Sequence, residues 1–178
     1  MSTSDGQAAL AEEVVTELAA IFAPGDLLTR PADCWAYGYD NSRQQALPGA
    51  VCFARNTRQV VELVRLCNRQ RIPLTTRGRG TGTTGASVPA AGAVILAMER
   101  LRETLLIDPD NRIAVASPGF TNQELQDAAA QYGFFWPPDP TSAAVCTLGG
   151  NLAYNSAGPR AVKYGTPREN TLGLLAVT

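Results

Sequence analysis

A glycine-rich segment limits the folds open to this chain more than any other feature of its sequence. Residues 77–85 read Arg-Gly-Arg-Gly-Thr-Gly-Thr-Thr-Gly. Glycine adopts left-handed backbone conformations that other residues avoid, so this density of glycines predicts a tightly folded loop. The flanking residues 72–76 and 93–96 are rich in apolar and β-branched side chains and predict two short strands. The loop therefore joins two strands.

The residues before this loop predict a parallel arrangement. Residues 50–53 form a short apolar run that is typical of a buried strand. Asn56 or Thr57 is suited to cap a helix that runs to about Gln70. A strand, a helix and a second strand in this order predict a small parallel sheet with the helix on one face.

Two common nucleotide-binding motifs are disfavoured by the residues that follow the loop. Residues 80–85 match G-x-G-x-x-G, but a dinucleotide-binding fold needs a helix directly after this motif. Pro89 and Gly92 interrupt any such helix. A P-loop needs a lysine after its last glycine, and the only lysine of the chain is Lys163. We therefore expect neither fold.

The loop nevertheless has the composition of an anion-binding site. Consecutive N–H groups of a glycine-rich segment can converge into a concave site for phosphate. Arg77 and Arg79 add positive potential, and the Thr81 hydroxyl adds a donor. The alternative is a simple tight turn, which needs fewer glycines than this segment has. We therefore predict that the loop binds a pyrophosphate group.

The second half of the chain predicts a separate set of elements that begins near Leu105. Residues 113–116 predict a strand. The sequence Thr-Asn-Gln-Glu at 121–124 is a capping box, and it begins a helix that Gly133 ends. Three prolines make residues 134–140 irregular, because proline lacks a backbone donor and fixes φ.

The two ends of the chain complete this outline. Residues 7–22 carry apolar side chains at helical spacing. The aromatic rings of Trp35, Tyr37 and Tyr39 are expected in the core, with a lobe interface or a partner surface as alternatives. Residues 149–151 and 155–159 are expected to be irregular. Residues 172–177 predict an apolar strand, and a domain seldom stops inside such a strand. The sequence therefore predicts the N-terminal piece of a longer polypeptide.

Histidine is absent, and its absence excludes several classes of site. No Ser-His-Asp or Cys-His nucleophile can be built, and histidyl flavin linkages and histidine metal sites are excluded as well. The four cysteines form no C-x-x-C pair, which favours buried thiols in a reducing, cytoplasmic compartment. The formal net charge of −1 disfavours a nucleic-acid partner. The sequence contains no apolar run of about 18 residues, so we expect no transmembrane segment.

Two blocks of residues resemble the FAD-linked oxidase family, which shares the vanillyl-alcohol-oxidase-type flavin domain. The first block is residues 73–89, which contain the glycine-rich loop. The second block is similar to the branch that contains glycolate oxidase, D-lactate dehydrogenase and D-2-hydroxyglutarate dehydrogenase. It comprises Pro137-Pro-Asp-Pro140, Cys146-Thr-Leu-Gly-Gly-Asn151, Asn155, Gly158-Pro159 and Lys163-Tyr-Gly165. The resemblance extends from about Pro48 to Thr178.

This resemblance implies an α+β fold, namely a two-lobed FAD-binding domain that is truncated at its C-terminal end. A small parallel βαβ lobe would occupy residues 48–104, and a mixed or antiparallel α+β lobe residues 105–178. Residues 1–47 would be an N-terminal helix and an irregular lead-in. FAD would lie noncovalently between the lobes. The residues implied to hold it are Arg77, Gly78, Arg79, Gly80, Thr81, Gly82, Pro138, Cys146, Gly149, Gly150, Asn151, Ala153, Asn155, Gly158, Tyr164 and Gly165.

The resemblance also implies that substrate lies under a further domain beyond these residues, so no catalytic residue and no metal ligand is expected here. The leading hypothesis is the FAD-binding part of an enzyme that oxidises a small 2-hydroxy acid by hydride transfer to FAD. An unidentified acceptor would receive the electrons, and the 178 residues alone would be inactive. The alternative is a non-catalytic flavin- or nucleotide-binding electron-transfer subunit. The apolar residues 172–177 could also associate with another chain, so an oligomer is possible.

Overall fold

A parallel sheet organises the first half of the chain. The computed structural model describes residues 10–178, and its larger sheet has the strand order β1-β2-β4-β3. β2 (Ala50–Phe53) and β3 (Leu74–Arg77) both run parallel to the central β4 (Val94–Ala97). β1 (Leu27–Leu28) pairs antiparallel with β2. The register aligns the three parallel strands, so their carboxyl ends meet at one edge of the sheet.

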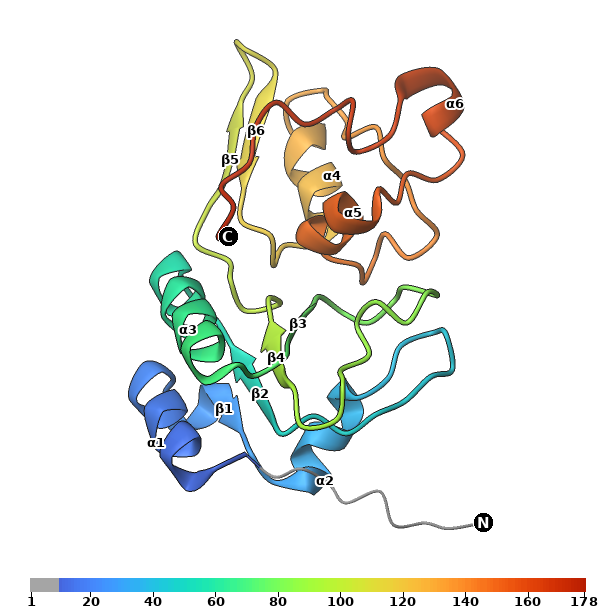
Figure 1. Cartoon of the computed structure of the whole chain (residues 1–178). Helices are drawn as coiled ribbons and strands as arrows, with labels where there is room; N and C mark the ends of the chain where they lie inside the picture. Colours follow the sequence, from blue (N-terminus) through green and yellow to red (C-terminus); the bar gives the residue numbers. More distant parts are fainter. Residues whose placement is uncertain (1–9) are drawn as a thin grey trace.

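Two helices cover one face of this sheet, as Figure 1 shows. α3 (Thr57–Gln70) connects β2 to β3, and the side chain of Asn56 caps it by accepting the N–H of Gln59 at 3.0 Å. α1 (Glu12–Ile21) packs beside α3. The predicted cap and helix end are therefore confirmed. α1 begins later than expected, and residues 7–9 of the expected helix lie outside the described residues.

Strand alternation divides the apolar side chains between two clusters. One face of the sheet contacts α1 and α3 through Ala50, Cys52, Val94 and Leu96. The opposite face is covered by the short helices α2 (Pro31–Cys34) and η2 (Trp35–Tyr37), which follow η1 (Pro24–Asp26) and β1. Its buried residues are Cys34, Val51, Phe53, Ile95 and Ala97.

The aromatic residues of this covering segment do not all enter the core. Tyr37 packs edge-on against Phe53, with ring centroids 5.3 Å apart. Trp35 and Tyr39 are 56% and 47% exposed, so the prediction that they are core residues is wrong. The tight turn of η2 directs only one of its two rings toward the sheet.

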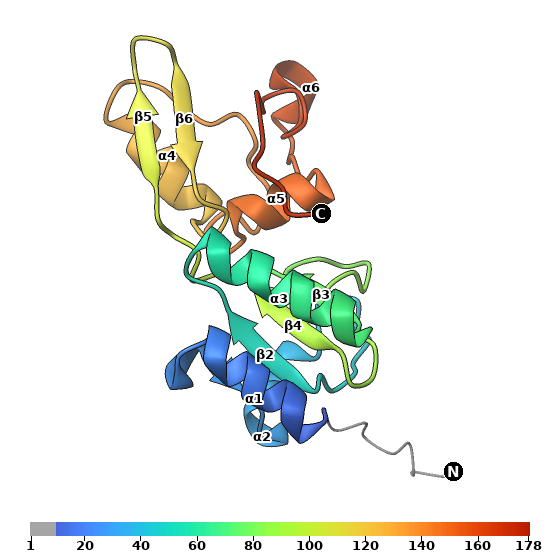
Figure 2. The ribbon, with the colours of Figure 1, turned by 60° about the vertical axis from the view of Figure 1, so that its left-hand side comes forward.

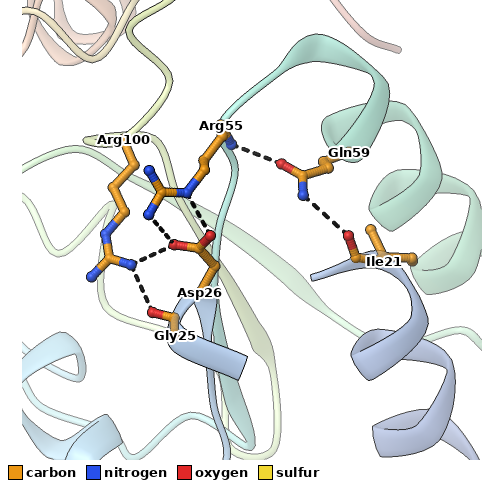
Figure 3. Close-up of polar contacts among 6 residues, drawn as sticks. All are labelled: Ile21, Gly25, Asp26, Arg55, Gln59 and Arg100. Atoms are coloured by element: carbon orange, nitrogen blue, oxygen red, sulfur yellow. Dashed lines mark hydrogen bonds and ion pairs between the residues drawn. The ribbon is translucent and has the colours of Figure 1, made fainter. Parts of the chain in front are cut away.

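A buried carboxylate fastens the N-terminal segment to the sheet (Figure 3). Asp26 is 3% exposed and accepts hydrogen bonds from Arg55, which follows β2, and from Arg100, which follows β4. Arg100 also donates to the carbonyl of Gly25 at 2.7 Å. The hydrogen bonds from Arg55 oppose the effect of burial and, together with Arg100, hold the pKa of Asp26 below its usual value. Three segments distant in sequence are therefore joined at one carboxylate.

The second lobe is built on a hairpin and a helix. β5 (Leu105–Asp108) pairs antiparallel with β6 (Ile113–Ala116), and α4 (Asn122–Ala130) packs on this hairpin. Figure 2 shows the hairpin and α4 standing apart from the four-stranded sheet. Thr121 and Glu124 exchange both bonds of the predicted capping box, which is confirmed. The helix ends at Ala130, slightly before Gly133.

Two predictions for the end of the chain are wrong. Residues 149–151 were expected to be irregular but lie in α5 (Leu148–Tyr154), because the hydroxyl of Thr147 caps its first turn and Leu148 is buried. This anchoring outweighs the low helix propensity of two glycines. Residues 172–177 form no strand, because no described residue pairs with their backbone. A short helix, α6 (Ala161–Tyr164), precedes them.

No helix among residues 10–178 combines the length and the apolar character that a membrane crossing requires.

Candidate functional site

The glycine-rich loop leaves β3 at the carboxyl edge of the parallel sheet. No helix follows it, as predicted, and β4 comes next. Gly80 and Gly85 have φ values of +66° and +79°, which favour glycine strongly. Among the described residues, no acceptor binds any backbone N–H from Gly78 to Ala86. The loop therefore presents a run of unused donors, which is the arrangement that an anionic group requires.

A buried arginine lies beneath this loop. Arg77 is 7% exposed, and its Nη1 donates to the carbonyl of Tyr39 at 2.7 Å. Its guanidinium fills the space that a Cβ at Gly80 would need. Among residues 10–178, no carboxylate lies within ion-pair distance of Arg77. Burial lowers the pKa of Arg77, but an arginine keeps its charge at neutral pH. An anion beside the loop would balance this charge.

A hollow of about 340 Å³ opens next to the loop. Arg79 lies at the hollow with its Nη1 2.7 Å from a carboxylate oxygen of Glu99. Val145 reaches the hollow from the second lobe, so both lobes contribute to its wall. The full lining is Ala36, Tyr37, Arg77, Gly78, Arg79, Thr81, Glu99 and Val145.

The loop contacts α5 at two places. The α-carbon of Gly78 faces the hydroxyl of Thr147, with no room for a side chain between them. The hydroxyl groups of Thr83 and Tyr154 are 3.3 Å apart. α5 lies on the side of the second lobe that faces the first (Figures 1 and 2). The loop and the start and end of α5 therefore form the junction between the lobes.

Buried groups of the second block surround the start of α5. Asn151 is 2% exposed, and its Nδ2 donates to no described residue. Asn122, at the start of α4, holds Pro138 and Cys146 in place. Its Nδ2 donates to the carbonyl of Pro138 at 3.1 Å, and its backbone N–H donates to the carbonyl of Cys146 at 3.1 Å. Gly149 packs so closely on Pro118 that a Cβ would lie 2.7 Å from that ring. These contacts fix α5 against the chain that precedes α4.

The remaining members of the second block lie at the end of α5 and near α6. Ala153 and Asn155 are exposed at the end of α5, and the Oδ1 of Asn155 accepts the N–H of Arg168 at 3.1 Å. Gly158, Tyr164 and Gly165 lie near α6, at the far side of the second lobe in Figure 1. The ring of Tyr164 packs edge-on against Phe135 at 5.2 Å. The structure therefore brings the loop together with the start and end of α5 but not with the α6 region.

Several residues of this junction carried no signal in the sequence. Thr147 stands within the second block without a predicted role, and Tyr154 lies outside the predicted site. Asn41 donates from its backbone to the carbonyl of Gly82 at 3.0 Å and from its side chain to that of Thr81 at 3.3 Å. These contacts of Asn41 join residues 40 or more positions apart, so local patterns do not report them.

Comparison with known proteins identifies the domain. Residues 48–178 match the family described as "FAD binding domain". The chain belongs to this family. The predicted resemblance and the α+β FAD-binding fold are therefore confirmed, and FAD is the cofactor of this domain.

Relatives and solved structures agree with this family. The chain is 33% identical over 169 residues to glycolate oxidase subunit GlcD of Bacillus subtilis (strain 168) and 35% identical over 168 residues to D-lactate dehydrogenase of Archaeoglobus fulgidus. These alignments cover 94% and 92% of this chain but 36% and 35% of the relatives, so the chain spans about a third of their length. A structure of alkyldihydroxyacetonephosphate synthase has a TM-score of 0.81 at 25% identity, over 90% of this chain and 35% of that one. A structure of p-cresol methylhydroxylase shares the fold with a TM-score of 0.70 at 24% identity, over 81% and 29% of the two chains.

Proposed function

We propose that this chain is the FAD-binding part of a flavin-dependent oxidoreductase that oxidises a small 2-hydroxy acid such as glycolate or D-lactate. The observation that carries the proposal is the loop of unused N–H donors above a buried, unpaired arginine in a domain of the FAD binding family. The names of the relatives, which oxidise glycolate or dehydrogenate D-lactate, support the substrate class. The acid and the electron acceptor would meet the cofactor under polypeptide beyond these residues.

The residues present fit FAD. The loop residues 77–82 would bind the pyrophosphate through backbone N–H groups, and the guanidinium of Arg77 would balance its charge. The unpaired Nδ2 of Asn151 is a buried donor with no partner among the described residues, which a polar cofactor atom would satisfy. Bound FAD supplies the redox chemistry by accepting a hydride. The second-lobe residues proposed to line its adenosine, ribityl and ring portions are Pro138, Cys146, Gly149, Gly150, Asn151, Ala153, Asn155, Gly158, Tyr164 and Gly165.

We infer that the protein holds FAD noncovalently. The chain has no histidine, and the Cys146 side chain is 3% exposed among close contacts. A thioether bond would need this sulfur to reach the cofactor through those contacts.

The remaining proposals concern organisation and partners. Residues 48–104 and 105–178 would be the two FAD-binding lobes, with residues 1–47 as lead-in, and the two separate sheets support the boundary at 105. The exposed side chains of Leu172, Leu174 and Leu175 support a contact with further polypeptide or a second copy. Four buried, unpaired cysteines support a cytoplasmic location.

The test is a titration of the purified chain with FAD, followed by anaerobic addition of D-lactate or glycolate to a longer polypeptide that continues past residue 178. We expect saturable FAD binding by the chain and bleaching of the flavin absorbance in the longer protein. Denaturation should release intact FAD into the supernatant. Absence of FAD binding would refute the proposal. FAD binding without reduction by any small 2-hydroxy acid would instead favour the electron-transfer subunit.

A further inference from the structure

A short segment of the N-terminal lead-in, residues 39–41, contacts the glycine-rich loop. Asn41 contacts the loop twice, because its backbone N–H donates to Gly82 and its side-chain amide donates to Thr81. The carbonyl of Tyr39, two residues earlier, accepts the hydrogen bond from the buried Arg77. Residues 39–41 lie before position 48, where the match to the family begins. The loop of the family domain is thus shaped by residues that the family description does not include.

Asp40 fixes this segment in position. It is 5% exposed and accepts hydrogen bonds from the backbone of Ser42 at 2.9 Å and from the hydroxyl of Ser87 at 3.2 Å. Burial alone would raise its pKa, but these hydrogen bonds outweigh burial and lower it. Ser87 lies beyond the far end of the glycine-rich segment. Residues 39–41 are therefore attached to the loop near its start, in its middle and after its end.

The two contacts of Asn41 determine which way the loop N–H groups point. In a trans peptide the C=O and the N–H of the same plane point in opposite directions, and the described chain has no cis peptide. The carbonyl of Thr81 points to Asn41, so the N–H of Gly82 points away from it. The carbonyl of Gly82 also points to Asn41, so the N–H of Thr83 points away from Asn41 as well. Both are among the loop donors without an acceptor in the described part of the chain.

We propose that Asn41 is a positioning residue for the pyrophosphate: its two hydrogen bonds orient the Thr81 and Gly82 peptide groups so that the following N–H groups face the phosphate. This inference rests on the proposed FAD site and extends that site to residues 39–41. Asn41 itself is exposed and touches the loop through the carbonyl side only. Its effect on the ligand therefore passes through the peptide groups and not through direct contact.

The experiment compares Asn41→Ala and Asn41→Asp with the unchanged chain in titrations with FAD and with riboflavin, which has no phosphate. Asn41→Ala removes the bond to Thr81 and should weaken FAD binding about two- to tenfold, the loss expected for one neutral hydrogen bond. Asn41→Asp keeps the shape but sets a carboxylate against the Thr81 carbonyl, so the loss should be larger. Riboflavin affinity should stay unchanged in both variants.

A matched control is Asn111→Ala, which removes an exposed asparagine amide bonded to Asp108 in the β5–β6 turn. It should leave both affinities unchanged, and the melting temperatures of all three variants should stay within about 2 °C of the parent. Unchanged FAD affinity in both Asn41 variants, with FAD binding intact in the parent, would overturn the positioning role alone. Equal losses for FAD and riboflavin would overturn it too. A parent chain that binds no FAD would refute the proposed function and this inference with it.

Discussion

Gly80 is the loop position at which a single methyl group should be most damaging. Its φ of +66° lies in the left-handed region, and its α-carbon faces the guanidinium of Arg77. Gly80→Ala therefore strains the backbone and forces the buried guanidinium to move. The guanidinium ends a flexible side chain, so it can move, but it would then give up its hydrogen bond to Tyr39.

The expected loss follows from these two effects. Left-handed strain at a non-glycine residue costs about 1–3 kcal/mol, and a lost hydrogen bond from a charged donor costs about 1.5–3 kcal/mol. For a chain of this size the melting temperature should fall by at least about 5 °C. FAD binding should weaken at least tenfold, because Arg77 no longer balances the phosphate charge and the loop donors shift.

Two other glycines make the experiment discriminating. A Cβ at Gly82 meets no atom within 4 Å, and its φ is not positive, so Gly82→Ala should leave the melting curve unchanged. If the pyrophosphate lies against this stretch, that methyl group should still weaken FAD binding about tenfold or more. Gly25→Ala also adds a Cβ in open space, outside the glycine-rich loop, and should change neither quantity.

Thermal denaturation without cofactor and fluorescence titration with FAD measure the two effects separately. The reasoning about Arg77 would be refuted if Gly80→Ala melted at the parent temperature. The assignment of the phosphate position would be refuted if Gly82→Ala bound FAD as tightly as Gly25→Ala does.

Two further predictions concern the first lobe. Because the pKa of Asp26 is lowered in the folded protein, its ion pairs contribute stability above about pH 4 that is lost as the pH falls through the folded pKa. Asp26→Asn should lower the free energy of unfolding at pH 7 by roughly 1–3 kcal/mol, a modest loss because Arg55 is largely exposed and its charge is screened by solvent. Chemical unfolding of the parent and the variant at pH 7 and at pH 3 should show that the difference in unfolding free energy between them becomes smaller in acid. Burial raises the pKa of Cys67 to about 11 and raises that of Cys52 further, so a thiol reagent should label neither in the native protein and both in denaturant. Rapid native labelling of these thiols, counted by intact mass, would contradict the packing of this core.

Local signals in the sequence predicted the elements whose causes are local. The Asn56 cap, the capping box of Thr121 and Glu124, and the apolar run of β2 each depend on residues within a few positions of one another. The glycine-rich loop was predictable as a loop for the same reason. Its phosphate-binding role stays a prediction.

Contacts between distant residues explain what the sequence could not show. α5 contains two glycines, and its local cap at Thr147 alone did not predict a helix. The distant contact that secures it is the hydrogen bond from the Gly149 N–H to the carbonyl of Pro118 at 3.0 Å. A strand at 172–177 would need a neighbouring strand, and apolar character alone does not supply one. The role of Asn41 depends on a contact across about forty residues that no sequence spacing announces.

The close approach of Gly78 to Thr147 makes the residue tolerated at one of these positions depend on the residue at the other. The same hydroxyl that caps α5 occupies the space beside the Gly78 α-carbon. A side chain at position 78 would push against Thr147, and it would therefore disturb both the contact between the lobes and the start of α5. The protein could recover only through a compensating change at position 147, and a smaller residue there would leave the helix without its cap. The packing of the loop against α5 thus depends on both residues, and a substitution at either position is expected to need a matching change at the other.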